Sequence, residues 1–530
     1  MKGKAIDQLC VMVLLAYFLH FSLPALGGGF SGHDTLNLYI YWLPGMLKSL
    51  RANICFWTSF YRPGGALYYL PLYHLFGLNP QPYRIAQISI LAASIPVVYY
   101  LARLLASSRS VAFLATFAFC YHAQLAELVF TGPYIYDVLC GFFYFSGLTY
   151  YIHIREKGRL LRPMQCVAFL ALYICALNAK EMAVTIPVMV LIYEILKSPR
   201  IGNWKEFVRC NWRSALPALI AGLLTAVYIY GKTHGATSLT KANLYRPEYS
   251  WHRFTVSNAH FIDEIFYGLI PNRIWPGVIV FAAWGLVFVY AFLRRDRLLQ
   301  LTSFWVVITP LPIAFLSLRG DACLYIPLFG WAVIVARLVS DLITLVSQAF
   351  AMAYRAGPLL APRPAQLSEE AANHDKRHSE SAGMSALAGK MSPSLFRAFA
   401  TFLAACGLAI FTQWENQRFN RIPALLISGE KAIHVIQALG SLNLHPAPGS
   451  MILLRGWPYR SDPFWQNGWN TVFIASLLYN DHSLRIYHEG TNQLTQQDMT
   501  KLDYIISLDE LHAQLDHAPT AVRGDIPPAL

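Results

Sequence analysis

Apolar stretches long enough to cross a lipid bilayer recur along most of this chain. A hydrocarbon core roughly 30 Å thick needs about 20 residues of helix at a rise of 1.5 Å per residue. Of the 530 residues, 55% are hydrophobic and only 13% are charged, whereas about a quarter of the residues of a soluble domain carry charge. The sequence therefore predicts an all-α polytopic membrane protein.

The apolar pattern predicts about eleven spanning helices. Their approximate bounds are 6–26, 84–104, 110–125, 135–153, 164–179, 183–196, 215–231, 275–293, 299–317, 323–346 and 396–412. The first segment follows Lys2 and Lys4 and also resembles a cleavable signal peptide. We favour a span, because the segment is long enough to cross the bilayer and the later topology requires it.

Basic residues cluster in every second connection between the predicted spans. With the N-terminus in the cytoplasm, each inward connection receives Lys or Arg, as the positive-inside rule expects. The clusters are Arg103/Arg109, Arg155/Lys157/Arg159/Arg162, Lys197/Arg200/Lys205/Arg209/Arg213 and Arg294/Arg295/Arg297. These clusters contribute to the net charge of +13, and we interpret them as a signal of membrane topology. Nucleic acid is therefore not an expected partner.

The chain divides into four parts. Residues 1–350 form the membrane module, with a long first outer loop at 27–83, and 396–412 form the last span. Residues 354–395 are polar and lack periodicity, which is typical of a flexible linker. Residues 413–530 predict a small outward-facing α/β domain, with a helix near 429–441 and strands at 451–454, 484–487 and 502–507. The nine cysteines show no CxxC spacing, and we expect neither a disulfide framework nor a metal site.

Asp34 is the first candidate for chemistry. It lies in Gly32-His33-Asp34-Thr35, directly after the first predicted span. A carboxylate there could accept the proton of an attacking hydroxyl, as general-base catalysis requires. Alternatively, Asp34 caps a helix that begins near Thr35, and residue type alone does not separate the two.

Cations and further acids follow along the same predicted face. Arg62, before a Pro-Gly turn, could bind phosphate or anchor the chain at the interface. Lys180 with Glu181, and Arg319 with Asp321, could be local ion pairs or could place a cation beside an anionic headgroup. A third group near one rim, open to catalytic or hydrogen-bonding roles, comprises His122, Glu127 and Asp137.

Several of these segments together resemble the GT-C class of integral membrane glycosyltransferases, specifically the transmembrane O-mannosyltransferases with tetratricopeptide repeats and their bacterial relatives. That family has an acid in the first outer loop, a Tyr-Arg-Pro, a His-Pro-x-His-x-Glu stretch, a Lys-Glu before a helix ending in Tyr-Asp, and an Arg followed by Leu-Tyr-Leu-Pro. The matching residues are Asp34; Tyr61-Arg62-Pro63; His122 and Glu127; Lys180-Glu181 through Tyr193-Glu194; and Arg319 with Leu324-Tyr325-Ile326-Pro327.

The chain also departs from the family. It has His33-Asp34 where paired acids are usual, and Ala123, Gln124 and Leu125 interrupt the His-Pro-x-His-x-Glu pattern. No repeat of about 34 residues is visible, which favours a bacterial inner-membrane protein.

The resemblance implies transfer of a sugar from a polyprenyl-phosphate donor to a protein or glycan hydroxyl on the extracytoplasmic side, with inversion. It implies that Asp34 is the general base, with Glu127 and His122 beside it. The implied phosphate ligands are Arg62, Lys180, Arg319 and Tyr325, and the implied acceptor or orienting residues are His33, Glu181 and Asp137. No cofactor is certain, and a divalent cation is compatible with the family.

Other functions stay open at this point. A transferase of whole lipid-linked glycans would need a wider donor site. A transporter or flippase of lipid-linked sugars should show repeated hydropathy and ionisable residues near the membrane centre. A non-catalytic scaffold is a further possibility. Aromatic residues are frequent at 455–459 and 464–470 in the tail. Such residues could stack on a sugar or form the core of a small domain, and we favour the core.

Overall fold

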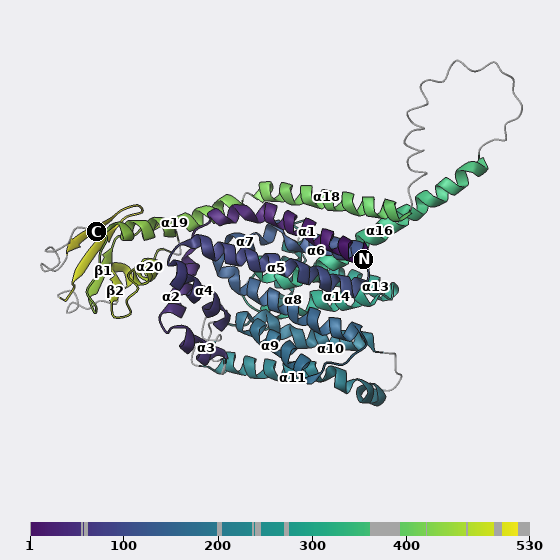
Figure 1. The fold of residues 1–530 in the computed structure, drawn as a ribbon, viewed down its shortest axis with the longest axis horizontal. Coiled ribbons are helices and arrows are strands. Elements are labelled where there is room, and N and C mark those ends of the chain that lie inside the picture. The colour runs from purple at the N-terminus through teal and green to yellow at the C-terminus, as the bar shows by residue number, and fades with distance from the viewer. Residues whose placement is uncertain are drawn as a thin grey trace, which may run out of the picture.

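The structure is a computed structural model. It describes residues 2–54, 57, 62–198, 204–235, 238, 245–269, 275–317, 319–360, 393–419, 421–462, 465–491 and 501–517. Figure 1 shows a bundle of long helices at one end and a small sheet domain at the other.

A helix lies over each of the predicted spans. The bundle helices are α1 (Lys2–Ser22), α5 (Pro80–Ala106), α6 (Arg109–Cys120), α8 (Ile135–Glu156), α9 (Pro163–Ala179), α10 (Ile186–Lys197), α11 (Trp204–His234), α13 (Pro276–Leu293), α14 (Arg297–Ile308), α16 (Tyr325–Leu360) and α18 (Pro393–Phe419). Within the described residues, eight helices are long and apolar enough to cross a membrane, or up to nine if a bent pair is one span. The protein is therefore a polytopic membrane protein.

The number of full-length spans differs from the expected number at several places. α9 and α10 are short, at 17 and 12 residues, and α8 has 22 residues but is not among the eight apolar spans. The helix at Arg109–Cys120 bends by 41° before Ala123–Phe130. Conversely, one of the eight, Ile422–Ser441, lies within α19 (Arg421–Ser441), in the region that the sequence assigned to the outer domain.

The linker prediction is only partly covered by the described residues. α16 continues to Leu360 and α18 begins at Pro393, so both ends of the predicted 354–395 segment are helical. Residues 361–392 lie outside the described residues.

Short helices occupy the end of the bundle that faces the sheet domain. They are α2 (Gly32–Trp42), α3 (Met46–Ile54) and α4 (Pro63–Phe76) in the first loop, α12 (Trp251–Ile265), and α7 (Glu127–Phe130) and α15 (Leu311–Ala314) between spans. Single turns of 3₁₀ helix accompany them: η1 (Leu23–Gly27), η2 (Ala123–Leu125), η3 (Gly132–Tyr134), η4 (Glu181–Thr185) and η7 (Asp321–Leu324). We call this end the domain-facing rim and the other end the opposite rim.

The C-terminal domain contains a four-stranded sheet in the order β2-β1-β3-β4. Its strands are β1 (Met451–Arg455), β2 (Arg485–His488), β3 (Tyr504–Leu508) and β4 (Ala513–His517), with α20 (Trp469–Tyr479) between β1 and β2. β1 pairs in parallel with β2 and β3, and β4 is antiparallel to β3. The sequence predicted the first three strands. It did not predict α20 or β4.

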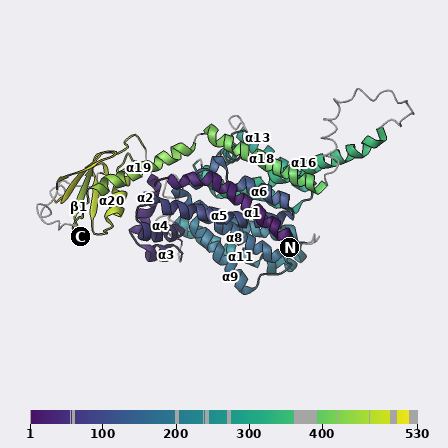
Figure 2. The same cartoon turned by 45° about the horizontal axis from the view of Figure 1, so that its top comes forward.

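The domain packs against the first loop of the membrane module through α20 and the turn that follows it. The ring of Tyr39 stacks on Phe473 at 4.8 Å, and Trp42 stacks on His482 at 3.9 Å. The indole of Trp42 also donates a 2.8 Å hydrogen bond to the Asn480 side chain. Figure 2 shows the same arrangement from a second direction, with α20 beside α2. The tail aromatic Trp465 is 3% exposed, in agreement with the core interpretation.

Candidate active site at the domain-facing rim

Asp34 lies at the start of α2, three residues after the N-cap residue Ser31. The backbone N–H and the hydroxyl of Ser31 donate to Asp34 Oδ2 at 2.9 and 3.1 Å, which forms a capping box. Asp34 thus caps its helix, as one sequence interpretation expected. Capping does not account for its burial: the residue is only 3% exposed, whereas N-terminal helix positions are commonly solvated.

Two further groups from other helices reach the Asp34 carboxylate. The Tyr69 hydroxyl on α4 donates to Oδ1 at 3.0 Å, and Arg84 on α5 brings Nη2 within 3.9 Å of Oδ2. Burial raises the pKa of Asp34, and Arg84 and the hydrogen bonds from Ser31 and Tyr69 partly oppose this. A carboxylate of raised pKa is suited to proton transfer near neutral pH.

Segment 127–134 approaches Asp34 through Gly132. This glycine lies so close to Asp34 that a Cβ there would come within 2.0 Å of Oδ1. Glu127 begins α7 and shares a hydrogen bond with the Tyr134 side chain. Gln87 on α5 holds the segment by donating to the carbonyls of Leu128 and Thr131 at 2.7 and 3.1 Å. The segment that begins with Glu127 therefore reaches the Asp34 carboxylate at Gly132.

The predicted cations Arg62 and Lys180 form ion pairs between distant parts of the chain. Arg62 contacts Glu181 through Nη2–Oε2 at 2.8 Å, and Lys180 Nζ contacts both Asp137 oxygens at 2.5 and 2.6 Å. Burial raises the pKa of Glu181, but Arg62, followed by Lys232, lowers it to a net value of about 2. The predicted local pair of Lys180 with Glu181 does not form.

The backbone at Lys180 explains why these sequence neighbours have different partners. Its φ and ψ are −158° and 153°, an extended conformation between α9 and η4. Successive side chains of an extended segment point to opposite sides, so Lys180 faces α8 while Glu181 faces Arg62.

A third buried cation, Lys232, comes from the end of α11 and was not a sequence candidate. It is 3% exposed, its ammonium lies 5.5 Å from the Tyr228 ring centre, and its charge acts on Glu181 and Arg62. We call Arg62, Lys180 and Lys232 the cation cluster. Two carboxylates, Asp137 and Glu181, lie among these three cations.

Arg319 lies beside the cation cluster. Its guanidinium stacks over the Tyr245 ring at 4.7 Å, and its charge acts on Cys323. The Cys323 sulfur in turn lies 3.3 Å from Lys180 Nζ. Arg319 and Lys180, two of the predicted phosphate ligands, are therefore both neighbours of Cys323.

Tyrosines connect Asp34 to the cation cluster. The Tyr41 and Tyr136 hydroxyls are 2.9 Å apart, and Tyr41 donates to the Arg62 carbonyl at 2.5 Å. The Arg62 guanidinium lies over the Tyr136 ring at 5.1 Å, and Tyr41 stacks on Tyr69, the donor to Asp34. The carboxylate and the cations are therefore adjacent parts of one polar site.

Two predicted residues lie outside this site. Tyr325 stacks on Phe119 at 4.7 Å, and its side chain bonds to Ser94 in the helix core. His122 places Nε2 3.0 Å from the Ile265 carbonyl and stacks on Tyr267 at 4.2 Å. A third predicted residue, His33, is next to Asp34 in the sequence, and its side chain is exposed.

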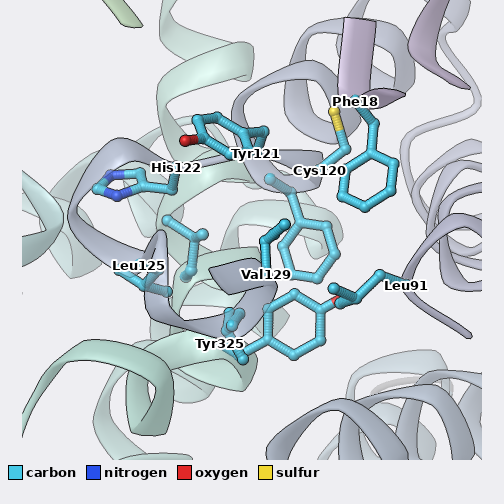
Figure 3. A pocket seen from close by; sticks show the side chains of 11 residues that line it. Phe18, Leu91, Cys120, Tyr121, His122, Leu125, Val129 and Tyr325 are labelled. Carbon is cyan, nitrogen blue, oxygen red and sulfur yellow. The ribbon is translucent and has the colours of Figure 1, made fainter. Parts of the chain in front are cut away.

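A small cavity lies beside Tyr325 and His122. Phe18, Leu91 and Val129 are among its lining side chains, as Figure 3 shows. Its volume is about 10 Å³, barely enough for one water molecule. This cavity is therefore a gap in helix packing and is too small for a sugar.

Comparisons with known proteins find likeness in structure only. No protein-family model matches the chain, and no curated protein matches its sequence. ArnT from Cupriavidus metallidurans, bound to undecaprenyl phosphate, matches with a TM-score of 0.47 and 12% identity over 96% of this chain and 93% of that chain. The archaeal oligosaccharyltransferase AglB from Archaeoglobus fulgidus, in complex with an inhibitory peptide and a dolichol-phosphate, matches with a TM-score of 0.43 and 12% identity over 95% and 69%. Both are GT-C fold glycosyltransferases, the class that the motifs of this chain resemble.

Proposed function

We propose that this chain is a membrane glycosyltransferase that moves a sugar from a polyprenyl-phosphate donor to an acceptor hydroxyl at the domain-facing rim, on the extracytoplasmic side. One observation carries the proposal. A buried carboxylate of raised pKa, Asp34, lies beside a cluster of three buried cations. Glycosyl transfer from a lipid phosphate needs these two parts together.

The acceptor hydroxyl loses its proton to Asp34 as its oxygen attacks the anomeric carbon of the sugar. The bond between that carbon and the phosphate oxygen breaks, and the lipid phosphate leaves with the electron pair. A single displacement inverts the anomeric configuration. Because Ser31 and Tyr69 donate to both Asp34 oxygens, the carboxylate is held in a fixed orientation for the proton transfer.

The phosphate becomes more negative by one charge as it leaves. Preorganised cations stabilise such developing charge without reorganisation, and Arg62, Lys180, Lys232 and Arg319 supply them. Glu181 and Asp137 keep the cations in place before the donor binds. We assign to Glu127 the orientation of the acceptor, because the segment that it begins approaches Asp34 at Gly132.

The experiment uses the purified full-length chain in lipid nanodiscs with a panel of polyprenyl-phosphate sugars. We expect release of free polyprenyl phosphate with one donor class, and a product whose anomeric configuration is opposite to that of the donor. Movement of the intact lipid-linked sugar across vesicles, with no release from any donor, would replace the proposal with a flippase. Release only from donors that carry a whole glycan would indicate an oligosaccharide transferase.

A further inference from the structure

A groove runs between α1 and α18, on the outside of the bundle. Its volume is about 540 Å³, within the range of ligand-binding pockets. Its walls are Tyr17, His20 and Phe21 on α1 with Ala409, Ile410, Gln413, Trp414 and Gln417 on α18. Both helices are candidate membrane spans, so the groove opens onto the bilayer.

The chemistry of the groove changes with depth. α1 and α18 both run toward the domain-facing rim (Figure 1), so Ala409 and Ile410 lie deepest and Gln417 lies nearest the rim. These positions span about 12 Å at the rise of an α-helix. The deep end is apolar, and the shallow end carries the imidazole of His20 and the amides of Gln413 and Gln417.

The polar side chains at the shallow end are exposed on the surface of the bundle. Hydrogen-bonding groups on a membrane-facing surface are costly unless a polar group meets them. A phospholipid fits both ends of the groove. Its acyl chain fills the apolar deep end, and its ester and phosphate oxygens accept hydrogen bonds from the donors at the headgroup level. Trp414, which lies in the wall, is typical of that level.

The position of the groove argues against the sugar donor as its occupant. The cation cluster includes Lys232 on α11, and Figure 1 shows α11 at the opposite edge of the bundle from α1 and α18. A donor whose phosphate lies at Arg62 and Lys232 would place its tail on that other side.

We propose that the groove between α1 and α18 binds one phospholipid from the leaflet on the side of the C-terminal domain, as a structural part of the protein. The lipid joins α18 to α1 beside the direct hydrogen bond from the Tyr17 hydroxyl to Thr412 Oγ1 at 3.1 Å. α18 leads toward α19, where the Gly429 carbonyl packs tightly against Gly29, a short distance before Asp34. The bound lipid therefore supports the contact between α19 and the loop that carries Asp34.

The test measures lipid retained by the full-length protein after purification in mild detergent, by native mass spectrometry followed by lipid extraction. We expect about one phospholipid per wild-type chain. Ala409→Trp fills the deep end, and we expect it to lower retention at least about tenfold, because excluding a pair of methylenes already costs that much affinity. Leu403→Trp is the control, since Leu403 lies on α18, is 52% exposed and is not part of the groove wall. It should retain the lipid.

A second variant covers the case in which Ala409→Trp does not fold. Gln413→Leu with Gln417→Leu removes the headgroup donors without filling the groove, and it should also lower retention. Equal retention by wild type and a folded groove variant would overturn the proposal, as would a wild type without phospholipid or with polyprenyl phosphate in its place. The readout needs no turnover, so it is independent of the proposed transferase activity.

Discussion

The two rims of the bundle both contain buried ion pairs, but they differ in where those pairs lie along the helices. At the opposite rim, Arg155 on α8 contacts both oxygens of Glu194 on α10 at 2.7 and 2.8 Å, and the Tyr151 hydroxyl donates to the same carboxylate at 2.9 Å. Both residues of this pair lie on continuous helices. In this arrangement one cation is paired with one carboxylate.

At the domain-facing rim, the pairs lie where helices are interrupted. Lys180 separates α9 from η4, Glu181 is the first residue of η4, and Arg62 is the N-cap residue of α4. Lys232 adds a third buried cation beside Glu181. A buried ion pair by itself therefore does not indicate a functional site. Interrupted helices, three clustered cations and the buried Asp34 carboxylate together distinguish this rim.

The largest expected effect is the loss of stability when one partner of a buried ion pair is removed. Comparing the two rims separates this effect from an effect on donor binding. Lys180→Met leaves Asp137 buried without its cation, and Arg155→Met does the same to Glu194, so each should lower the free energy of unfolding by about 3–5 kcal/mol. Unfolding in mixed micelles measures this. Only Lys180→Met should also weaken donor binding. Adding Asp137→Asn to Lys180→Met should recover stability but not donor binding, and recovery of both would contradict the phosphate role.

Gly132→Ala tests the close approach of segment 127–134 to Asp34. The new Cβ would come within 2.0 Å of the carboxylate, and such overpacking costs about 1–3 kcal/mol. We expect reduced turnover with the fold retained. Gly285→Ala is the matched control, since nothing lies within 4 Å of its Cβ position. Similar turnover for the two variants would show that Asp34 need not be held in place.

Lys232→Met tests the contribution of Lys232 to the cation cluster. Loss of one charge-assisted hydrogen bond to phosphate, at about 1.5 kcal/mol, should weaken donor binding roughly tenfold. The binding of a fluorescent polyprenyl-phosphate analogue measures this. A thermal midpoint close to that of wild type would confirm that the effect is local, and unchanged affinity would remove Lys232 from the phosphate site.

Tyr69→Phe should have the smallest effect, a shift in the pH profile. The Tyr69 hydroxyl stabilises the ionised form of Asp34, so its removal raises the pKa of Asp34 further. Turnover requires the ionised base, and the acidic limb of the pH–rate profile should therefore move to higher pH. Tyr83→Phe, which removes a hydroxyl that bonds to the Gly77 carbonyl, should leave that limb where it is.

The sequence predicted the parts of this fold that depend on local pattern. Apolar length located the helices, and the pattern near Asp34 allowed the capping that the structure shows. The ordered motifs predicted Asp34, Glu127, Arg62, Lys180 and Arg319 as parts of one site, and the assignment of these residues to a common function stays a prediction.

The sequence did not predict pairing across the chain. Arg84 and Lys232 stand at the ends of predicted spans, where a cation ordinarily extends to the interface, and only tertiary packing places them beside Asp34 and Glu181. Tyr325 matched a motif but begins a helix whose packing directs its ring toward Phe119. α20 and β4 were missed because their short apolar patterns depend on the neighbouring strands for support.

The most direct test of the central claim measures donor binding and chemistry separately in Asp34→Asn. With the donor bound in excess protein, single-turnover release of polyprenyl phosphate is followed alongside donor affinity. We predict affinity close to that of wild type and a rate lower by about 10²–10⁴, the usual contribution of a general base. Asp341→Asn, which alters a carboxylate of the opposite rim paired with Arg294, should leave both unchanged. Undiminished release by folded Asp34→Asn would contradict the assignment of the base.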